Sequence, residues 1–208
     1  MASFIKGISI MQQMTTRQLQ AQQTKESIYN AAIKLFELRG YENVLIEDIT
    51  NEANCAKGTF YLYYKSKKDL MYETVTRYNE ISDRAYEEVK NIADFKEKLI
   101  KYSMYYYEGV RKTGRQILRA LDGNNVLDGA TDVVNSDDRS IYRVLDQLVE
   151  EGMEQGYLSR ERDKAHYKRA LITTFLGVDY YWCTRDEVDV VDLITQQVGY
   201  VLGGMMKD

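Results

Sequence analysis

The chain contains no proline in 208 residues, although an average usage of about 5% would give roughly ten. Its absence argues against collagen-like chains, polyproline linkers and the β architectures whose turns are built on proline. Apolar residues make up 44% of the chain and charged residues 29%, which is ordinary for a folded protein of one or two domains. We therefore predict an all-α fold of about nine helices.

The cysteines and the N-terminal segment bear on cofactors and localisation. Cys55 and Cys183 are the only cysteines and lie far apart, so the sequence offers neither a disulfide framework nor a zinc ligand set. The first apolar residues are interrupted by Lys6, Gly7 and Ser9, which leaves neither a signal-peptide core nor the roughly 20 apolar residues of a membrane span. We expect a cytoplasmic protein with no metal, no cofactor and no membrane partner.

Charge is distributed unevenly along the chain, whose net charge is -4. Residues 1–72 carry nine Lys and Arg against seven Asp and Glu, whereas residues 73–208 carry 19 against 25. Between positions 53 and 68 every charged residue is a lysine: Lys57, Lys65, Lys67 and Lys68. A confined basic segment in an acidic protein indicates an anion-binding face, and the alternative is a solvated lysine cluster without a ligand.

Helical periodicity surrounds this basic segment. From position 24 the apolar residues recur with the spacing of one helix face and a glycine follows as a stop signal, at Ile28, Ala31, Ala32, Leu35, Phe36 and Gly40. Short helices are predicted over residues 45–53 and 57–63, joined by a turn in which Asn54 can adopt the left-handed conformation. A long helix is predicted from Ser66, its expected N-cap, to Val89. This order predicts a helix-turn-helix.

Three sequence runs carry a more specific resemblance: residues 40–43 (GYEN), 46–49 (IEDI) and 57–70 (KGTFYLYYKSKKDL). Over residues 24–70 the chain resembles the DNA-binding domain of the TetR/AcrR (tetracycline-repressor-like) family of transcription regulators. The resemblance implies a variable helical domain for ligand binding and dimerisation after it. We therefore expect a flexible extension over residues 1–23, a DNA-binding domain over 24–70, and an effector-binding and dimerisation domain over 71–208.

Seven residues of the motif are candidates for DNA contact: Lys57, Gly58, Thr59, Tyr61, Leu62, Tyr63 and Lys67. The two lysines suit phosphate neutralisation, which anchors a protein on the duplex without reading its sequence. Phe60 and Tyr64 are four residues apart and are expected to point together into the core. Thr59 and Tyr61 can then reach base edges or thymine methyl groups. The resemblance assigns a phosphate contact to the position of Tyr63.

Four positions bear on how closely this domain meets DNA. Gly58 either lets the backbone approach the phosphates, where free amides of the first helical turn can donate to them, or lets two helices pack closely. Ala56 and Leu45 stand where the resembling family commonly has a capping serine or threonine, so two helix caps are expected to be lost. Arg17 is a candidate for an arm in the minor groove, with disorder as the alternative.

The rest of the sequence predicts amphipathic helices over residues 94–112, 140–154, 164–183 and 188–206, with a short segment over 117–121. Residues 122–138 predict a loop, which does not fit a calcium site because Val126 and Leu127 break the pattern. In the resembling family the last two helices pair with their mates in a dimer. We expect a homodimer, and a monomer core is the alternative.

Aromatic residues recur along these helices, and five are candidates to line an effector cavity: Tyr78, Tyr102, Tyr106, Phe175 and Trp182. Aromatic residues at helical spacing also form cores, so the alternative is packing without a ligand. A cavity lined by them would suit a flat or lipophilic molecule, with Asp179 or Glu108 selecting a cation.

The sequence lacks a G-x-S-x-G nucleophile elbow, a glycine-rich phosphate loop and a Cys or His cluster, so we expect no enzyme activity. The expected function is that of a bacterial, ligand-responsive transcription regulator. It is expected to repress by binding a two-fold related DNA operator as a dimer, and to be released by a small-molecule effector. The alternative is a helical sensor or protein-interaction adaptor whose DNA-binding domain no longer works. The missing caps at Ala56 and Leu45 and the negative net charge of the chain favour this alternative.

Overall fold

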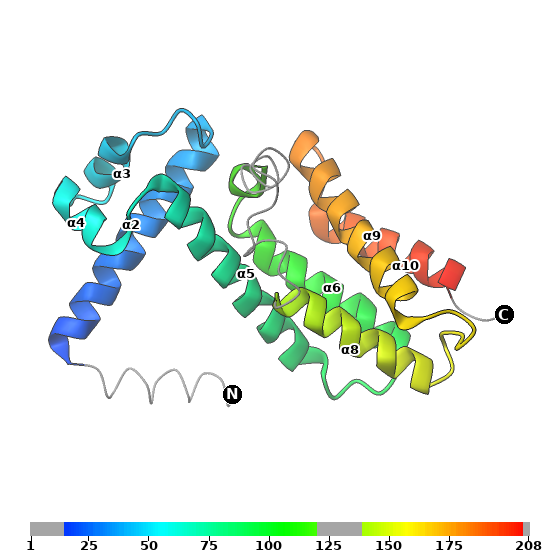
Figure 1. Ribbon diagram of the computed structural model, residues 1–208. Coiled ribbons are helices and arrows are strands. Elements are labelled where there is room, and N and C mark those ends of the chain that lie inside the picture. The colour runs from blue at the N-terminus through cyan, green and yellow to red at the C-terminus, as the bar shows by residue number, and fades with distance from the viewer. Residues whose placement is uncertain (1–14, 120–138, 206–208) are drawn as a thin grey trace. The chain divides into compact units, whose positions relative to one another are not determined.

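The computed structural model describes residues 15–119 and 139–205, which form helices joined by turns and contain no β-strand (Figure 1). The all-α prediction is confirmed. In chain order the helices are α2 (Thr16–Arg39), α3 (Ile46–Glu52), α4 (Lys57–Tyr63), α5 (Lys67–Val89), α6 (Phe95–Arg111), α8 (Ser140–Glu154), α9 (Lys164–Thr184) and α10 (Val190–Met205). Residue contacts divide the chain into two compact units, with the boundary between Leu70 and Met71.

Helix α2 begins at Thr16, earlier than the apolar pattern predicts. The Gln18 N–H donates to the Thr15 hydroxyl at 3.3 Å, and the Thr15 N–H donates to the Gln18 side-chain oxygen at 2.8 Å. This capping box engages backbone donors that a helix start otherwise leaves unpaired. Residues 15–23, for which we expected flexibility, are thus a helix and its cap, and Arg17 lies on that helix. Residues 1–14 lie outside the described part of the chain.

The first unit has a small core between α2, α3 and α4. Its buried apolar side chains are Ile28, Tyr29, Ala31, Ala32, Leu35, Phe36, Val44, Ile49, Phe60, Tyr64 and Leu70. Burial of each large apolar side chain contributes about 1.5–3 kcal/mol. The rings of Phe60 and Tyr64 lie 5.7 Å apart, so both point inward as their spacing predicts. Asn54 in the turn has a φ of 52°, the left-handed conformation expected of it.

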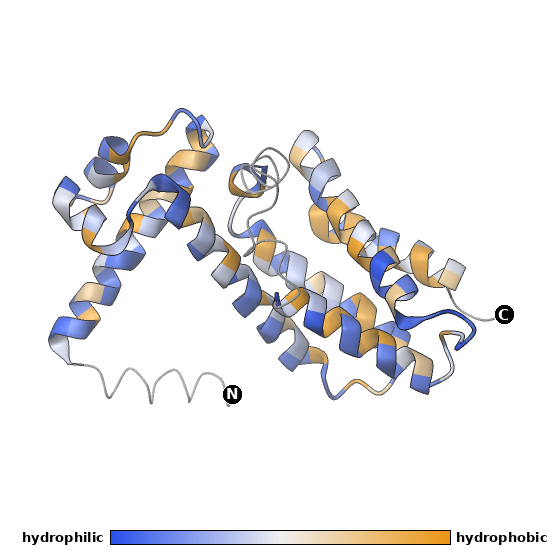
Figure 2. Ribbon diagram, viewed as in Figure 1, coloured by the Kyte–Doolittle hydropathy of each residue, from blue (hydrophilic) through white to orange (hydrophobic). Residues whose placement is uncertain are grey.

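In the second unit α10 packs against both α6 and α9, and α8 packs against α6 and α9. Figure 2 shows polar and apolar residues alternating along α5, α6 and α8, as amphipathic helices require. Gly152 permits a close approach of α8 to α6, because an added Cβ would lie 2.8 Å from the Phe95 ring. The core is rich in tyrosine, with Tyr102, Tyr107 and Tyr167 among its largest fully buried side chains.

The segment after α6 is described only in part. Gly114 has a φ of 83°, which favours glycine, and residues 115–119 form a short helical segment with Ile117 and Leu118 buried. Leu121 and the predicted loop over residues 122–138 lie outside the described residues. Within residues 15–119 and 139–205, no helix has the length and apolar character needed to cross a membrane.

Candidate nucleic-acid interface

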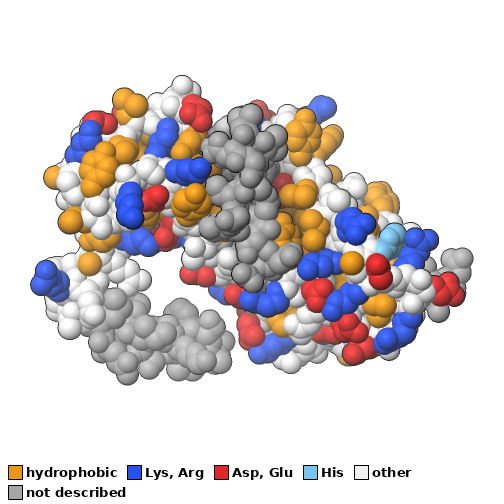
Figure 3. Space-filling view, viewed as in Figure 1, with side chains coloured by type: hydrophobic (Ala, Val, Ile, Leu, Met, Phe, Trp, Pro, Cys, Tyr) orange, Lys and Arg blue, Asp and Glu red, His pale blue; other side chains and the backbone are white. Residues whose placement is uncertain are grey.

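Helix α4 presents one face to the core and another to the outside. Phe60 is fully buried, whereas Tyr61 is 48% exposed and Leu62 is 80% exposed. Thr59 and Tyr63 are partly exposed. Figure 3 shows Lys and Arg side chains next to exposed hydrophobic side chains over α3 and α4. An outward apolar side chain adds nothing to the core, but it can contact thymine methyl groups in the major groove.

Gly58 lies in the first turn of α4 with open space around it. A Cβ built at this position would have no atom within 4 Å, so close packing of two helices does not explain the glycine. The Thr59 and Phe60 amides bond to the carbonyl of Ala56, at 2.8 and 3.4 Å. The amides that precede them in this turn have no helical partner, as at any helix start, and can donate hydrogen bonds to an anion. Close approach to a phosphate backbone stays a prediction for this glycine.

Lys57 forms an ion pair with Glu47, which lies in the first turn of α3. The pairing raises the pKa of Lys57, and the hydrogen bond from Lys57 lowers the pKa of Glu47. Both side chains are about half exposed, and such pairs contribute little to stability. A DNA phosphate can therefore replace the Glu47 carboxylate as the partner of Lys57. The sequence did not indicate that Glu47 pairs with Lys57. Acidic residues are common in the first turn of a helix, so Glu47 did not stand out.

Lys67 has a different environment from Lys57. Its ammonium donates to the carbonyls of Tyr41 at 2.6 Å and Val44 at 3.0 Å, and it lies 4.2 Å from the centre of the Tyr41 ring. Burial lowers the pKa of Lys67, and burial followed by the charge of Glu42 raises the pKa of Tyr41 to about 12. Lys67 thus stabilises the link between α2 and α3 through hydrogen bonds to its main-chain carbonyls. The position of Lys67 in the motif did not indicate this role.

The two short helices lack side-chain caps at Leu45 and Ala56, as the sequence indicates. At α3 the loss is partly offset, because the Leu45 N–H donates to the Asp48 carboxylate at 2.8 Å. This is the reciprocal half of a capping box. The start of α4 has no such side chain, so its first-turn donors depend on water or on a ligand.

The five candidate effector residues all lie in the core of the second unit: Tyr78, Tyr102, Tyr106, Phe175 and Trp182. The hydroxyl of Tyr102 is 2.8 Å from that of Ser82, and the ring of Tyr106 is 6.0 Å from that of Phe175. Burial raises the pKa of both Tyr102 and Tyr106. Their role in effector binding stays a prediction, since dense packing also accounts for them.

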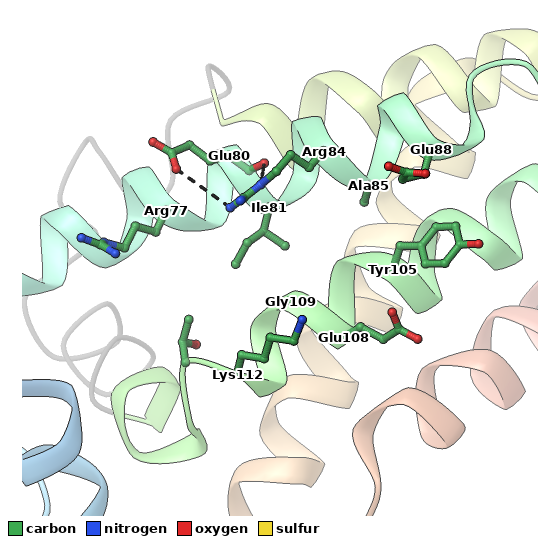
Figure 4. Close-up of a pocket in the computed structure, with 11 residues that line it drawn as sticks. Arg77, Glu80, Ile81, Arg84, Ala85, Glu88, Tyr105, Glu108, Gly109 and Lys112 are labelled. Atoms are coloured by element: carbon green, nitrogen blue, oxygen red, sulfur yellow. Dashed lines mark hydrogen bonds and ion pairs between the residues drawn. The ribbon is translucent and has the colours of Figure 1, made fainter. Parts of the chain in front are cut away.

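Two cavities are lined by described residues of the second unit, and neither lining includes those five aromatic residues. One lies between α5 and α6, has a volume of about 510 Å³, and includes Glu108 (Figure 4). The other has a volume of about 520 Å³ and is lined by α9 and α10. Asp179, the second acid considered for a cation, accepts a hydrogen bond of 2.7 Å from Tyr107.

A helix-turn-helix whose second helix faces outward, followed by a separate helical unit, is an arrangement found in DNA-binding transcription regulators. Residues 28–74 match the model of the family described as bacterial regulatory proteins, tetR family. The match covers the second half of α2, all of α3 and α4, and the start of α5, which is the helix-turn-helix part of the chain.

Two curated relatives are regulators by name. An HTH-type transcriptional regulator of Staphylococcus aureus (strain USA300) is 27% identical over 108 residues, which cover 51% of this chain and 58% of that protein. The chain thus matches little more than half the length of that relative. The fatty acid metabolism regulator protein of Bacillus subtilis (strain 168) is 23% identical over 181 residues, covering 86% of this chain and 93% of that protein.

Solved structures share the fold. The fatty acid degradation regulator FadR from Bacillus halodurans has a TM-score of 0.75 at 23% identity, covering 87% of this chain and 95% of that chain. FadR from Bacillus subtilis in complex with stearoyl-CoA has a TM-score of 0.70 at 21% identity, covering 86% of this chain and 98% of that chain.

Proposed function

We propose that this protein is a ligand-responsive transcription repressor that binds a two-fold related DNA operator as a homodimer. The observation that carries the proposal is the outward face of α4, where Tyr61 and Leu62 are exposed and the space around Gly58 is open. Lys57 supplies a phosphate contact at the start of the same helix, and Thr59 and Tyr63 complete the contacting set. Lys67 supports this surface from within the unit.

The dimer is part of the proposal, because two recognition helices are needed to read a two-fold operator. Tyr180 of α9 is 70% exposed and Tyr200 of α10 is 72% exposed, and Leu176 and Tyr181 are also exposed. Exposed apolar side chains gathered on neighbouring helices mark a protein interface. The cavity lined by α9 and α10 supports a second copy as the partner, seated against this face.

The proposed effector is a small aromatic or lipophilic molecule that separates the buried aromatic residues of the second unit. The stearoyl-CoA held by the Bacillus subtilis structure is a property of that protein, and it supports long acyl compounds as the first to test here. Release from DNA requires that the effector prefer one dimer conformation by a few kcal/mol, about the size of ordinary allosteric coupling. The role proposed for this effector is to regulate DNA binding, and no catalysis is proposed.

The first experiment is selection of bound duplexes from a random DNA pool, followed by measurement of affinity against salt concentration. We expect a two-fold related sequence whose affinity falls as salt rises, because lysine–phosphate contacts release counterions. Absence of enrichment at low salt would contradict the proposal. It would favour the helical sensor or adaptor, with the uncapped start of α4 at Ala56 as the first cause to examine.

A second experiment tests the dimer. Tyr180→Glu combined with Tyr200→Glu places charge on the exposed face of α9 and α10, and we expect monomers in sedimentation together with a loss of operator affinity. Leu38→Glu, at an exposed apolar side chain of α2, is the control for the dimer state. A double variant that sediments like the wild type would show that the dimer uses another face.

A further inference from the structure

The cavity between α5 and α6 is a groove with an apolar floor and charged walls (Figure 4). Its volume of about 510 Å³ lies in the range of small-molecule sites, about 300–1,000 Å³. The floor forms where the helices approach most closely, since a Cβ on Gly109 would lie 2.4 Å from the Ile81 Cγ2 atom. Ala85, one turn further along α5, also lines the groove. The floor can therefore cover a short hydrocarbon chain.

The cationic side chains of the α5 wall have acidic partners on their own helix. Arg77 pairs with Glu73 at 3.3 Å, and Arg84 pairs with Glu80 at 4.0 Å. Two other acids of the lining differ from these. Within residues 15–119 and 139–205, no side-chain hydrogen bond or ion pair engages Glu88 or Glu108. The groove thus holds two carboxylates without a side-chain partner among the described residues, one on each wall, and a single further cationic side chain, Lys112.

These two carboxylates lie at one end of the groove, Glu88 on α5 and Glu108 on α6, with the ring of Tyr105 beside them (Figure 4). Tyr105 is 38% exposed, so its ring is accessible from the groove. Carboxylates attract an ammonium group, and an aromatic face adds a cation–π interaction. A hydrated inorganic cation would gain nothing from the ring or from the apolar floor. The surroundings suit an organic cation.

We propose that this groove binds an aliphatic organic cation carrying a single positive charge. Its ammonium group lies between Glu88 and Glu108 against Tyr105, and its hydrocarbon part lies on the floor formed by Ile81. Lys112, the C-cap residue of α6, lies four positions after Glu108 and also lines the groove, so a second positive charge would be repelled there. The site is separate from the aromatic core assigned to the effector above, and the proposal concerns binding alone, without dependence on DNA recognition.

The test is isothermal titration calorimetry of the full chain with hexyltrimethylammonium, with 1-hexanol as the neutral probe and spermidine as the polycation. We expect saturable binding of hexyltrimethylammonium and at least tenfold weaker binding of the other two. Glu88→Gln and Glu108→Gln should each weaken binding about tenfold, because each removes one charge-assisted contact. Lys112→Gln should strengthen it, because a like charge is removed.

Glu161→Gln, an equal change of charge at an exposed position outside the groove, is the matched control and should leave affinity unchanged. Glutamine keeps the shape of glutamate, and thermal unfolding of each variant verifies its fold. Equal affinities for hexyltrimethylammonium and 1-hexanol, or equal affinities of the Glu88 and Glu108 variants and the wild type, would overturn the proposal. Because no DNA is present, this failure is distinguishable from a failure of the duplex selection.

Discussion

Lys57 and Lys67 illustrate how one residue type takes two roles within a single motif. Lys57 pairs with an exposed carboxylate, whereas Lys67 donates to two main-chain carbonyls of the link between α2 and α3. Their partners lie 10 and more than 20 positions away in sequence, so spacing within the motif carries no information about them. The structure therefore separates a lysine in an exposed ion pair from one that supports the fold, and the DNA contact of Lys57 stays a prediction.

The Lys57 pairing predicts a gain of DNA affinity from Glu47→Gln. The change frees Lys57 and removes a negative charge beside α4, so we expect operator affinity to rise by roughly threefold to tenfold. Lys57→Ala should weaken binding across sequences and reduce the salt slope by about one. Fluorescence anisotropy at several salt concentrations measures both effects. Glu154→Gln, exposed at the end of α8, is the control, and unchanged affinity in Glu47→Gln would argue against Lys57 as a phosphate contact.

The Lys67 contacts predict a loss of stability from Lys67→Met. The change leaves the Tyr41 and Val44 carbonyls without this donor, and we expect the free energy of unfolding to fall by about 1–3 kcal/mol. Lys57→Met, at an exposed pair, should change it by less than about 0.5 kcal/mol. Urea unfolding followed by circular dichroism measures both. Equal stabilities of the two variants would contradict the supporting role of Lys67.

Helix ends show where periodicity is a poor guide at the scale of an element. The amphipathic pattern of α2 starts near Ile28, yet the helix starts at Thr16, where Thr15 and Gln18 cap each other. The T-x-x-Q sequence was the available signal, since a capping box depends on four neighbouring residues and not on burial. The recognition helix α4 was predicted with its observed bounds, because its start and end are marked by local motif residues.

Gly58→Ala predicts opposite effects on folding and on DNA binding. The open space around Gly58 accommodates a methyl group, and alanine favours helix, so the free energy of unfolding should rise by up to about 1 kcal/mol. If the phosphate backbone approaches this turn, the same methyl group should weaken operator affinity about tenfold. Urea unfolding and anisotropy measure the two effects. A gain in stability without a loss of operator affinity would show that the phosphate backbone does not contact the turn at Gly58.

At the scale of the whole molecule, tyrosines that folding takes out of water make the free energy of unfolding depend on pH in the alkaline range. Burial raises the pKa of Tyr41 from 10.0 to about 12, and it raises the pKa values of Tyr102 and Tyr106 as well. A group whose pKa is raised by folding stabilises the folded state below its unfolded pKa. That contribution is lost progressively as pH rises from the pKa of the unfolded state through the pKa of the folded state. Stability should therefore decline above pH 10.

The expected decline is about 1.4 kcal/mol per pH unit for each such tyrosine. Denaturant unfolding between pH 8 and 11 measures it. Tyr102→Phe removes one of these groups and should make the decline shallower by about that amount, whereas Tyr61→Phe, on an exposed side chain outside the proposed dimer face, should not. Identical pH profiles of the wild type and the Tyr102 variant would refute this assignment.

The sequence by itself determined the all-α class, the helix-turn-helix and the resemblance to the TetR family, because these depend on residues that are neighbours along the chain. Periodicity also identified the buried faces, since Phe60 and Tyr64 point inward as their spacing requires. Only the tertiary structure decided which residues come together from separate elements: Lys57 pairs with Glu47, Lys67 donates to the carbonyls of the link, and Glu88 and Glu108 line one groove. The physical reason is that periodicity selects the face a helix buries, whereas the packing of separate helices selects the residues that this face contacts.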